Sequence, residues 1–131
     1  MAIAAKDVIL GFFEDLRTGN AEAAFARLAP DVDYRVMAPA PYGGTVDAQG
    51  LIAMAQNVFS KLAEPINVQV QRILTDGDHV VVEAVGQART LKGGNYDNNY
   101  LFLYRVVDGK IVEAREFLDS AKYVSLVEGQ F

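Results

Sequence analysis

The chain has 131 residues, of which 51% are hydrophobic and 22% charged, as in an ordinary globular protein. This length suits a single domain with a core of its own, so we expect one domain over residues 1–131. The net charge is −5 and the lysines and arginines are scattered singly, which argues against nucleic acid or an anionic membrane surface as the main partner. The absence of cysteine excludes disulfides and thiolate chemistry.

The sequence also argues against export, membrane insertion and metal binding. No apolar run approaches the ~18 residues of a membrane span. Asp7, Glu14 and Asp15 follow soon after the start, so we expect no signal peptide and a soluble, cytoplasmic protein. His79 is the only histidine and sits beside a predicted turn. We therefore expect neither a transition-metal site nor another cofactor.

The first part of the chain predicts two helices, one strand and a loop. Residues 4–17 place apolar side chains at helical spacing, and a second helix is expected over 21–29. Residues 31–37 alternate like a short strand that carries Tyr34. Residues 38–44 contain two prolines and two glycines, so we expect an irregular loop, of the kind that often rims a binding site.

The remainder predicts a third helix and then a run of strands. The helix is expected over 47–62, and a final short helix over 120–128. Strands are expected over 66–74 and 79–91, followed by a hairpin over 96–120. Helices before strands indicate an α+β fold, in which helices cover one face of a curved, mostly antiparallel sheet. Such packing leaves a central pocket between the layers.

The hairpin is the most informative stretch. The Asp-Gly pair at 108–109 lies between β-branched and aromatic residues, which predicts a two-residue type I′ turn. Regular pairing about this turn places Asn98 opposite Asp119, close enough to share one site. The residues expected on this face are Val106, Tyr104, Phe102, Tyr100 and Asn98, opposite Ile111, Glu113, Arg115, Phe117 and Asp119.

This assignment depends on an unbroken hairpin. One bulge between the turn and Asn98 would move the second strand by one residue and reverse its faces. Glu116 and Glu83 then become the candidate acids.

Two polar residues are the candidate catalytic groups. Asp119 is a candidate general acid or base, because burial in an apolar pocket can raise a carboxyl pKa by ~3–5 units. Asn98 is a candidate for orienting a ligand or Asp119. The alternative for Asp119 is a cap on the last helix, and for Asn98 an ordinary amide at a strand end.

Aromatic residues are the candidates for binding a small apolar or aromatic ligand. Tyrosine hydroxyls suit hydrogen bonds to a carbonyl or phenolate in a dry cavity. The alternative for each ring is core packing. The candidate ligand-binding residues are Tyr34, Tyr100, Phe102, Tyr104 and Phe117.

The other face of the hairpin predicts self-association. It carries Leu101, Leu103, Val107 and Val112, which would leave an apolar patch in water. We therefore expect a homodimer through the sheet.

Three phrases of the sequence resemble the NTF2-like superfamily and, within it, the SnoaL-like branch. They are LRTGNAEAAFARLAPDVDY at 16–34, DGDHVVVEAVG at 76–86 and YDNNYLFLYRVVDGKIVEAREFLDS at 96–120. The resemblance implies a cystatin-like cone of bent sheet and helices around a largely apolar pocket, commonly dimerised through the outer face of the sheet. In related epoxide hydrolases and polyketide cyclases a pocket carboxylate acts, and the matching position here is Asp119.

The resemblance leaves two functions open, because this fold hosts many activities. One is a cofactor-free isomerase, cyclase or hydrolase that uses a pocket carboxylate on a mostly apolar substrate. The other is a non-catalytic ligand-binding or dimeric assembly module. A cavity of ~300 Å³ or more with converging polar groups would favour ligand binding. A smaller cavity filled by side chains would favour the non-catalytic module.

Overall fold

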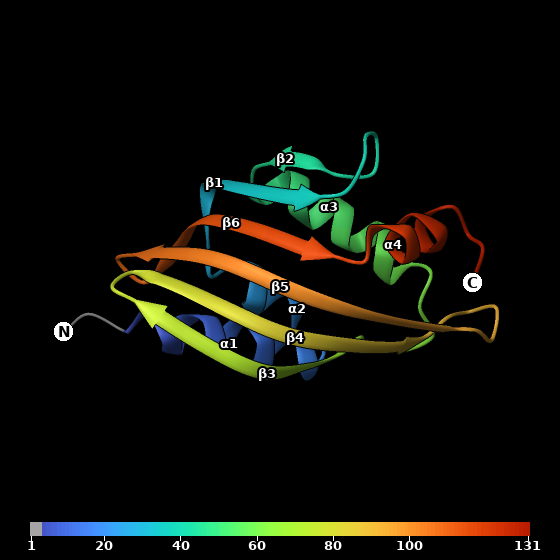
Figure 1. Cartoon of the computed structure of the whole chain (residues 1–131), viewed down its shortest axis with the longest axis horizontal. Coiled ribbons are helices and arrows are strands. Elements are labelled where there is room, and N and C mark those ends of the chain that lie inside the picture. Colours follow the sequence, from blue (N-terminus) through green and yellow to red (C-terminus); the bar gives the residue numbers. More distant parts are fainter. Residues whose placement is uncertain (1–3) are drawn as a thin grey trace.

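The computed structural model describes residues 4–131, which form a mixed sheet of six strands and four helices (Figure 1). Residues 1–3, at the start of the N-terminus expected to lack a signal peptide, lie outside the described residues. The strands are β1 (Leu28–Met37), β2 (Gly44–Val46), β3 (Asn67–Asp76), β4 (His79–Arg89), β5 (Asn95–Val107) and β6 (Lys110–Leu118). The helices are α1 (Ala5–Arg17), α2 (Ala21–Phe25), α3 (Ala48–Phe59) and α4 (Ser120–Val127).

The sheet confirms the predicted α+β class. Its strand order is β2-β1-β6-β5-β4-β3, and β1 pairs with β6 in parallel while the other neighbours are antiparallel. The four long strands of the second half thus form the antiparallel run that their alternating pattern predicted. The sheet is curved and stays open, with β2 at one edge and β3 at the other (Figure 1).

The helices cover the inner face of the sheet. Helix α1 packs against β3, β4 and β5, whereas α3 packs against β1 and β2. Helix α4 lies beyond the end of β6 and contacts β5 and α3 (Figure 1). This arrangement leaves space between α1, α3 and the middle of the sheet.

The second helix and the early strand differ from the prediction. The expected helix over 21–29 is wrong at its C-terminal end, because α2 stops at Phe25 and β1 starts at Leu28. Pro30 lies inside β1, where the pairing with β6 is irregular between Leu28 and Asp33. Proline donates no backbone hydrogen bond, and such an irregularity accommodates it.

Two further boundaries differ from the prediction. Helix α3 ends at Phe59 instead of residue 62, since Leu62 forms an isolated bridge with Thr90. The short strand β2, which pairs with Tyr34 and its neighbours, follows the predicted loop. Nothing in the sequence pattern indicated it.

The predicted hairpin turn is present, with φ of 51° at Asp108 and 77° at Gly109. Positive φ at both central residues is the mark of a type I′ turn. The predicted register beyond it is wrong. Val106 faces Ile111 as expected, but Arg105 faces Glu113, so one residue of β6 is extra.

This bulge reverses the faces of β6. Tyr104 pairs with Ala114, Phe102 with Glu116, and Tyr100 with Leu118. The structure therefore has Ala114, Glu116 and Leu118 on the inner face, where Glu113, Arg115 and Phe117 were expected. A shift of one residue has this effect because side chains alternate between the faces of a strand.

Candidate functional site

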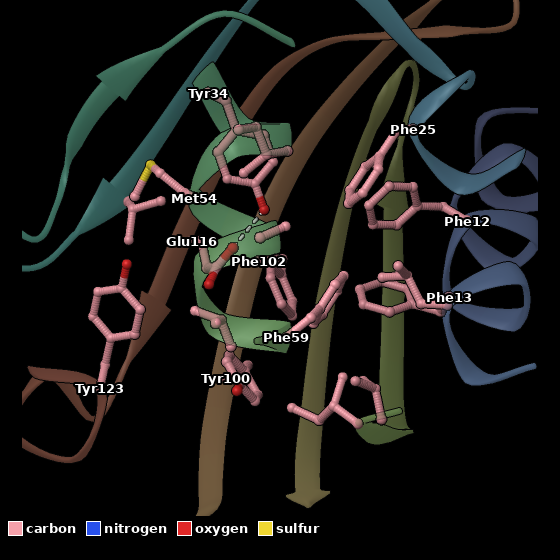
Figure 2. A pocket seen from close by; sticks show the side chains of 17 residues that line it. Phe12, Phe13, Phe25, Tyr34, Met54, Phe59, Tyr100, Phe102, Glu116 and Tyr123 are labelled. Carbon is pink, nitrogen blue, oxygen red and sulfur yellow. Dashed lines mark hydrogen bonds between the residues drawn. The ribbon is translucent and has the colours of Figure 1, made fainter. Parts of the chain in front are cut away.

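A cavity of about 130 Å³ lies between α1, α3 and the sheet. In Figure 2, Phe12 and Phe13 reach into it from α1, and Tyr123 approaches from the other side. Most of the lining is apolar. The lining side chains with polar tips are Tyr34, Tyr100, Glu116 and Tyr123.

The carboxylate of Glu116 is the central polar group of this cavity. The Tyr34 hydroxyl donates a hydrogen bond to its Oε1 over 2.5 Å, drawn as a dashed line in Figure 2. Strands β1 and β6 lie side by side, and Val36 pairs with Glu116 in the parallel register. The Tyr34 side chain therefore extends from β1 to the Glu116 carboxylate on the neighbouring strand β6.

Burial raises the pKa of the Glu116 carboxyl above its ordinary value, and the hydrogen bond from Tyr34 acts in the opposite direction. No lysine, arginine or histidine lines the cavity, and Glu116 takes part in no salt bridge among the described residues. Desolvation is thus not offset by a cation. Perturbed groups of this kind in a cavity are candidates for proton transfer.

The tyrosines around Glu116 are held in their protonated form. Burial, followed by the negative charge of Glu116, raises the pKa of Tyr123 to about 12. Burial is also the largest cause that raises the pKa of Tyr34, Tyr100 and Tyr104. These hydroxyls therefore remain hydrogen-bond donors at neutral pH.

Tyr104 lies behind the cavity wall, at 0% exposure. Its ring stacks on Phe102, with centroids 5.5 Å apart and planes 12° from parallel. Phe102 stacks in the same way on Tyr100 at 5.4 Å. The Tyr104 hydroxyl is a buried polar atom without a hydrogen-bond partner among the described residues. The three rings form one stack, of which Tyr100 and Phe102 line the cavity and Tyr104 lies behind them.

The structure places Asp119 outside the cavity. Asp119 is exposed and is the N-cap of α4, where its Oδ1 accepts a hydrogen bond from the Lys122 backbone N–H over 3.3 Å. This is the capping role that the sequence left open as an alternative. The bulge in β6 causes the change, since it turns Glu116 inward instead of the residues of the predicted face.

Asn98 is buried, at 3% exposure, but does not line the cavity. Its side chain contacts the backbone of Asp119, although the predicted register that placed the two residues directly opposite is wrong. The Asn98 Nδ2 donates to the Asp119 carbonyl over 3.1 Å, and its Oδ1 accepts from the Asp119 N–H over 2.9 Å. Asn98 thus joins β5 to the start of α4.

The aromatic candidates divide into three groups. Tyr34, Tyr100 and Phe102 line the cavity, whereas Tyr104 is buried behind it. The expected position of Phe117 is wrong, because it lies on the outer face of the sheet with 44% of its surface exposed.

Sequence reasoning missed the helical half of the cavity. Rings from α1, α2 and α3 face the sheet, and they were interpreted only as parts of amphipathic helices. One signal did point to Glu116. Ala114 and Leu118 flank Glu116 at the period of two, so this face of the strand is the apolar alternative that would carry Glu116 inward. The helical lining residues are Phe12, Phe13, Leu16, Phe25, Leu51, Met54, Ala55, Val58 and Phe59.

Within residues 4–131, no group of three or more histidine, aspartate or glutamate side chains is placed so as to hold a metal ion. In the same part of the chain, every helix is too short or too polar to cross a membrane.

The curved sheet, the covering helices and the cavity between them are those of the NTF2-like fold, which solved NTF2-like structures share. The family model for the SnoaL-like domain matches residues 9–114, so the chain belongs to the SnoaL-like family. No curated protein matches the sequence.

Three solved structures illustrate the likeness in fold. IdmH from Streptomyces antibioticus, described as a candidate polyketide cyclase, is 22% identical with a TM-score of 0.78, over 95% of this chain and 98% of its own. An NTF2-like protein of unknown function from Burkholderia pseudomallei is 22% identical with a TM-score of 0.80, over 94% and 96%. TerC, co-crystallised with polyporic acid, is 21% identical with a TM-score of 0.78, over 95% and 98%.

Proposed function

We propose that the protein is a cofactor-free enzyme of the isomerase or cyclase type, in which Glu116 carries a proton to and from a small, mostly apolar substrate. The observation that carries this proposal is the Glu116 carboxylate in an apolar cavity, with the Tyr34 hydroxyl 2.5 Å from Oε1 and no basic residue in the lining. The family supports a small-molecule pocket, and IdmH supports cyclase-type chemistry by analogy in fold.

The chemistry follows from the pair of oxygens on Glu116. Oε1 accepts the Tyr34 hydrogen bond, so Oε2 is the atom assigned to the substrate. When ionised, Oε2 takes a proton from the carbon that lies between a carbonyl group and a C=C double bond of the substrate. The electron pair of the broken C–H bond moves to the carbonyl oxygen, giving an enolate. The same carboxyl then returns the proton to a different carbon, and the double bond shifts.

A hydroxyl in the cavity would stabilise the enolate oxygen. Tyr123 donates its hydrogen bond to the Tyr42 carbonyl over 3.1 Å, and Tyr34 donates to Glu116. Tyr100 lines the same cavity, and burial raises its pKa. We assign it as the donor, because a protonated hydroxyl in a dry site stabilises developing negative charge.

Solvent hydrogen exchange tests this function. Cyclohex-2-enone is incubated in D₂O, and NMR follows loss of the protons next to its conjugated system. The wild-type protein is expected to accelerate exchange, and Glu116→Gln to lower the rate at least about 100-fold, the lower end of general-base contributions. Asp119→Asn is the control and should exchange at the wild-type rate. Equal rates for Glu116→Gln and the wild type would refute the assignment.

The second candidate is a non-catalytic ligand-binding or assembly module. The volume of about 130 Å³ favours it, since pockets for drug-sized ligands span ~300–1,000 Å³. The same exchange experiment separates the two functions. A module would bind the probe or ignore it, and would leave its exchange rate at the level of the buffer.

We also propose that the outer face of the sheet pairs with a second copy of the chain. Leu101 and Leu103 are 48% and 40% exposed, and Phe117 lies on the same face at 44%. The bulge thus adds an aromatic ring to the predicted apolar patch. Like patches can pair about a two-fold axis, which buries the same surface on both copies.

Sedimentation equilibrium at low micromolar concentration tests this association. The wild-type protein is expected to sediment as a dimer, and Leu101→Glu as a monomer. Leu91→Glu is the matched control, since Leu91 is 68% exposed but lies after the end of β4. A wild-type species of 14.3 kDa alone would contradict the dimer.

A further inference from the structure

The cavity is small enough to restrict the substrate by size. Its volume is about 130 Å³. An apolar cavity of ~150 Å³ engineered into another protein holds a benzene molecule. The cavity beside Glu116 therefore has room for about one six-membered ring, and a fused second ring would exceed its volume.

The walls favour a flat molecule. Phe13 packs against Phe102 with ring centroids 5.2 Å apart, and Phe102 stacks on Tyr100 at 5.4 Å. Phe13, Phe102 and Tyr100 thus form a continuous set of packed rings along one side of the cavity. Aromatic faces of this kind pack best against a planar ring.

The charges in the cavity favour an uncharged molecule. Among residues 4–131, Glu116 is the only carboxylate that lines the cavity, and no basic side chain lines it. A carboxylate or phosphate ligand would find no counter-charge and would be repelled by the ionised Glu116. A cationic amine would have to leave water and form a buried ion pair, whose desolvation cost commonly matches its attraction.

One wall of the cavity is shared with a neighbouring hollow. This hollow has a volume of about 300 Å³ and lies by the end of α3. Leu16, Phe59 and Ile66 line both spaces. Phe59 is the largest of the three, and it is only half-buried at the last residue of α3. Its ring is thus the main part of the partition between the two spaces.

We propose that the cavity takes an uncharged, planar compound of one six-membered ring, with its oxygen directed at the Tyr100 hydroxyl and a C–H group directed at Glu116, and that Phe59 sets this size limit. The inference rests on the proposed function for the choice of site. It adds the class of substrate, which is a compound of one ring.

Binding of simple probes tests the size and charge limits. Calorimetric titration at pH 7 compares phenol and cyclohex-2-enone with 2-naphthol, benzoate and benzylamine. We expect the two neutral single-ring probes to bind. 2-Naphthol should bind at least about tenfold more weakly than phenol, and the two charged probes should show no measurable binding. Binding of neither neutral probe, equal affinity for 2-naphthol and phenol, or binding of a charged probe as tight as that of phenol would overturn the proposal.

Phe59→Ala tests the partition directly. Joining the two spaces is expected to increase the affinity for 2-naphthol at least about tenfold over the wild type. Leu62→Ala is the matched control, because Leu62 lines the neighbouring hollow but not the cavity. It should leave 2-naphthol affinity unchanged. Phe59→Leu provides a milder opening if the alanine variant does not fold, and an unchanged affinity in a folded Phe59 variant would refute the role of Phe59.

One variant separates this inference from the proposed function. Glu116→Gln is expected to keep the preference for phenol over 2-naphthol, because the walls are intact, while it loses proton exchange. Wild-type size selectivity without any exchange would refute catalysis but not the ligand class. Exchange without size selectivity would refute the ligand class alone.

Discussion

Replacing Asn98 by alanine should destabilise the protein, because this side chain connects β5 to α4 from a buried position. Its amide takes part in four hydrogen bonds. Nδ2 donates to the Tyr96 hydroxyl over 2.9 Å and to the Asp119 carbonyl over 3.1 Å, and Oδ1 accepts from the backbone N–H groups of Asn99 over 2.8 Å and Asp119 over 2.9 Å. Asn98→Ala removes all four.

The magnitude follows from what each partner loses. A typical hydrogen bond contributes ~0.5–1.5 kcal/mol net, and a buried polar group left without a partner costs ~1–3 kcal/mol. Asp119 is exposed, so its backbone groups can regain water. The Tyr96 hydroxyl is on a side chain with 2% exposure and loses its donor from Asn98. We expect the free energy of unfolding to fall by about 2–4 kcal/mol.

Urea unfolding followed by circular dichroism measures this loss, provided that the transition is two-state. The midpoint should fall while the slope with urea stays constant. Asn95→Ala is the control, because Asn95 is exposed at the start of the same strand. Its effect should stay within ~0.5 kcal/mol. A decrease of less than ~0.5 kcal/mol in the free energy of unfolding of Asn98→Ala would refute the structural role. A loss of proton exchange without a loss of stability would show that Asn98 acts in the catalytic site.

Three further changes have defined outcomes. Tyr34→Phe removes a hydrogen bond that lowers the pKa of Glu116, so NMR titration should give a higher pKa, while Tyr123→Phe, in the same cavity, should change it less. Gly86→Ala places a Cβ 2.9 Å from the Tyr100 ring, and overpacking should lower the free energy of unfolding by about 1–3 kcal/mol in urea titrations. The wild type should lose stability relative to Glu116→Gln as pH rises from ~4.3 through the raised pKa of the folded state, by ~1.4 kcal/mol for each unit by which folding raises that pKa. Urea titrations at stepped pH measure this difference in the free energy of unfolding. A difference that does not change with pH would contradict the burial of the charge.

Much of the architecture was predictable because local chemistry determines it. A type I′ turn requires positive φ at both central residues, and Asp-Gly is one of the few pairs that adopt it readily. The structure has this turn at residues 108–109. Alternating apolar residues marked the four long strands. The caps at Asn20 and Asp47 are of the residue types that accept hydrogen bonds from the first helical turn, and both do so.

The orientation of β6 was not predictable from the turn alone. The register is right at Val106 and Ile111 and shifts before Arg105. Two neighbours determine the outcome, since β6 pairs with β5 on one side and with β1 on the other. The bulge places Ala114 in the core and Phe117 outside, a choice that depends on packing between segments far apart in the sequence. Glu116 consequently replaced Asp119 as the acid in the cavity.

The residues that the helices contribute to the cavity were also not predictable from the sequence pattern. Apolar spacing showed that α1 and α3 bury one face, but not which rings meet across the space. Phe59, the last residue of α3, lines the cavity, and α3 ends three residues earlier than expected. Element boundaries are set by tertiary contacts such as the bridge between Leu62 and Thr90.

The titration of Glu116 in the wild-type protein tests the central claim most directly. Carbon-13 NMR of the side-chain carboxyl groups, with Glu116→Gln to assign the signal, gives the pKa of this residue alone. The structure predicts a value above the ~4.3 of an ordinary glutamate, because the carboxylate lies in an apolar cavity without a cationic partner. A value at or below ~4.3 would show a solvated carboxylate and contradict the proposed site.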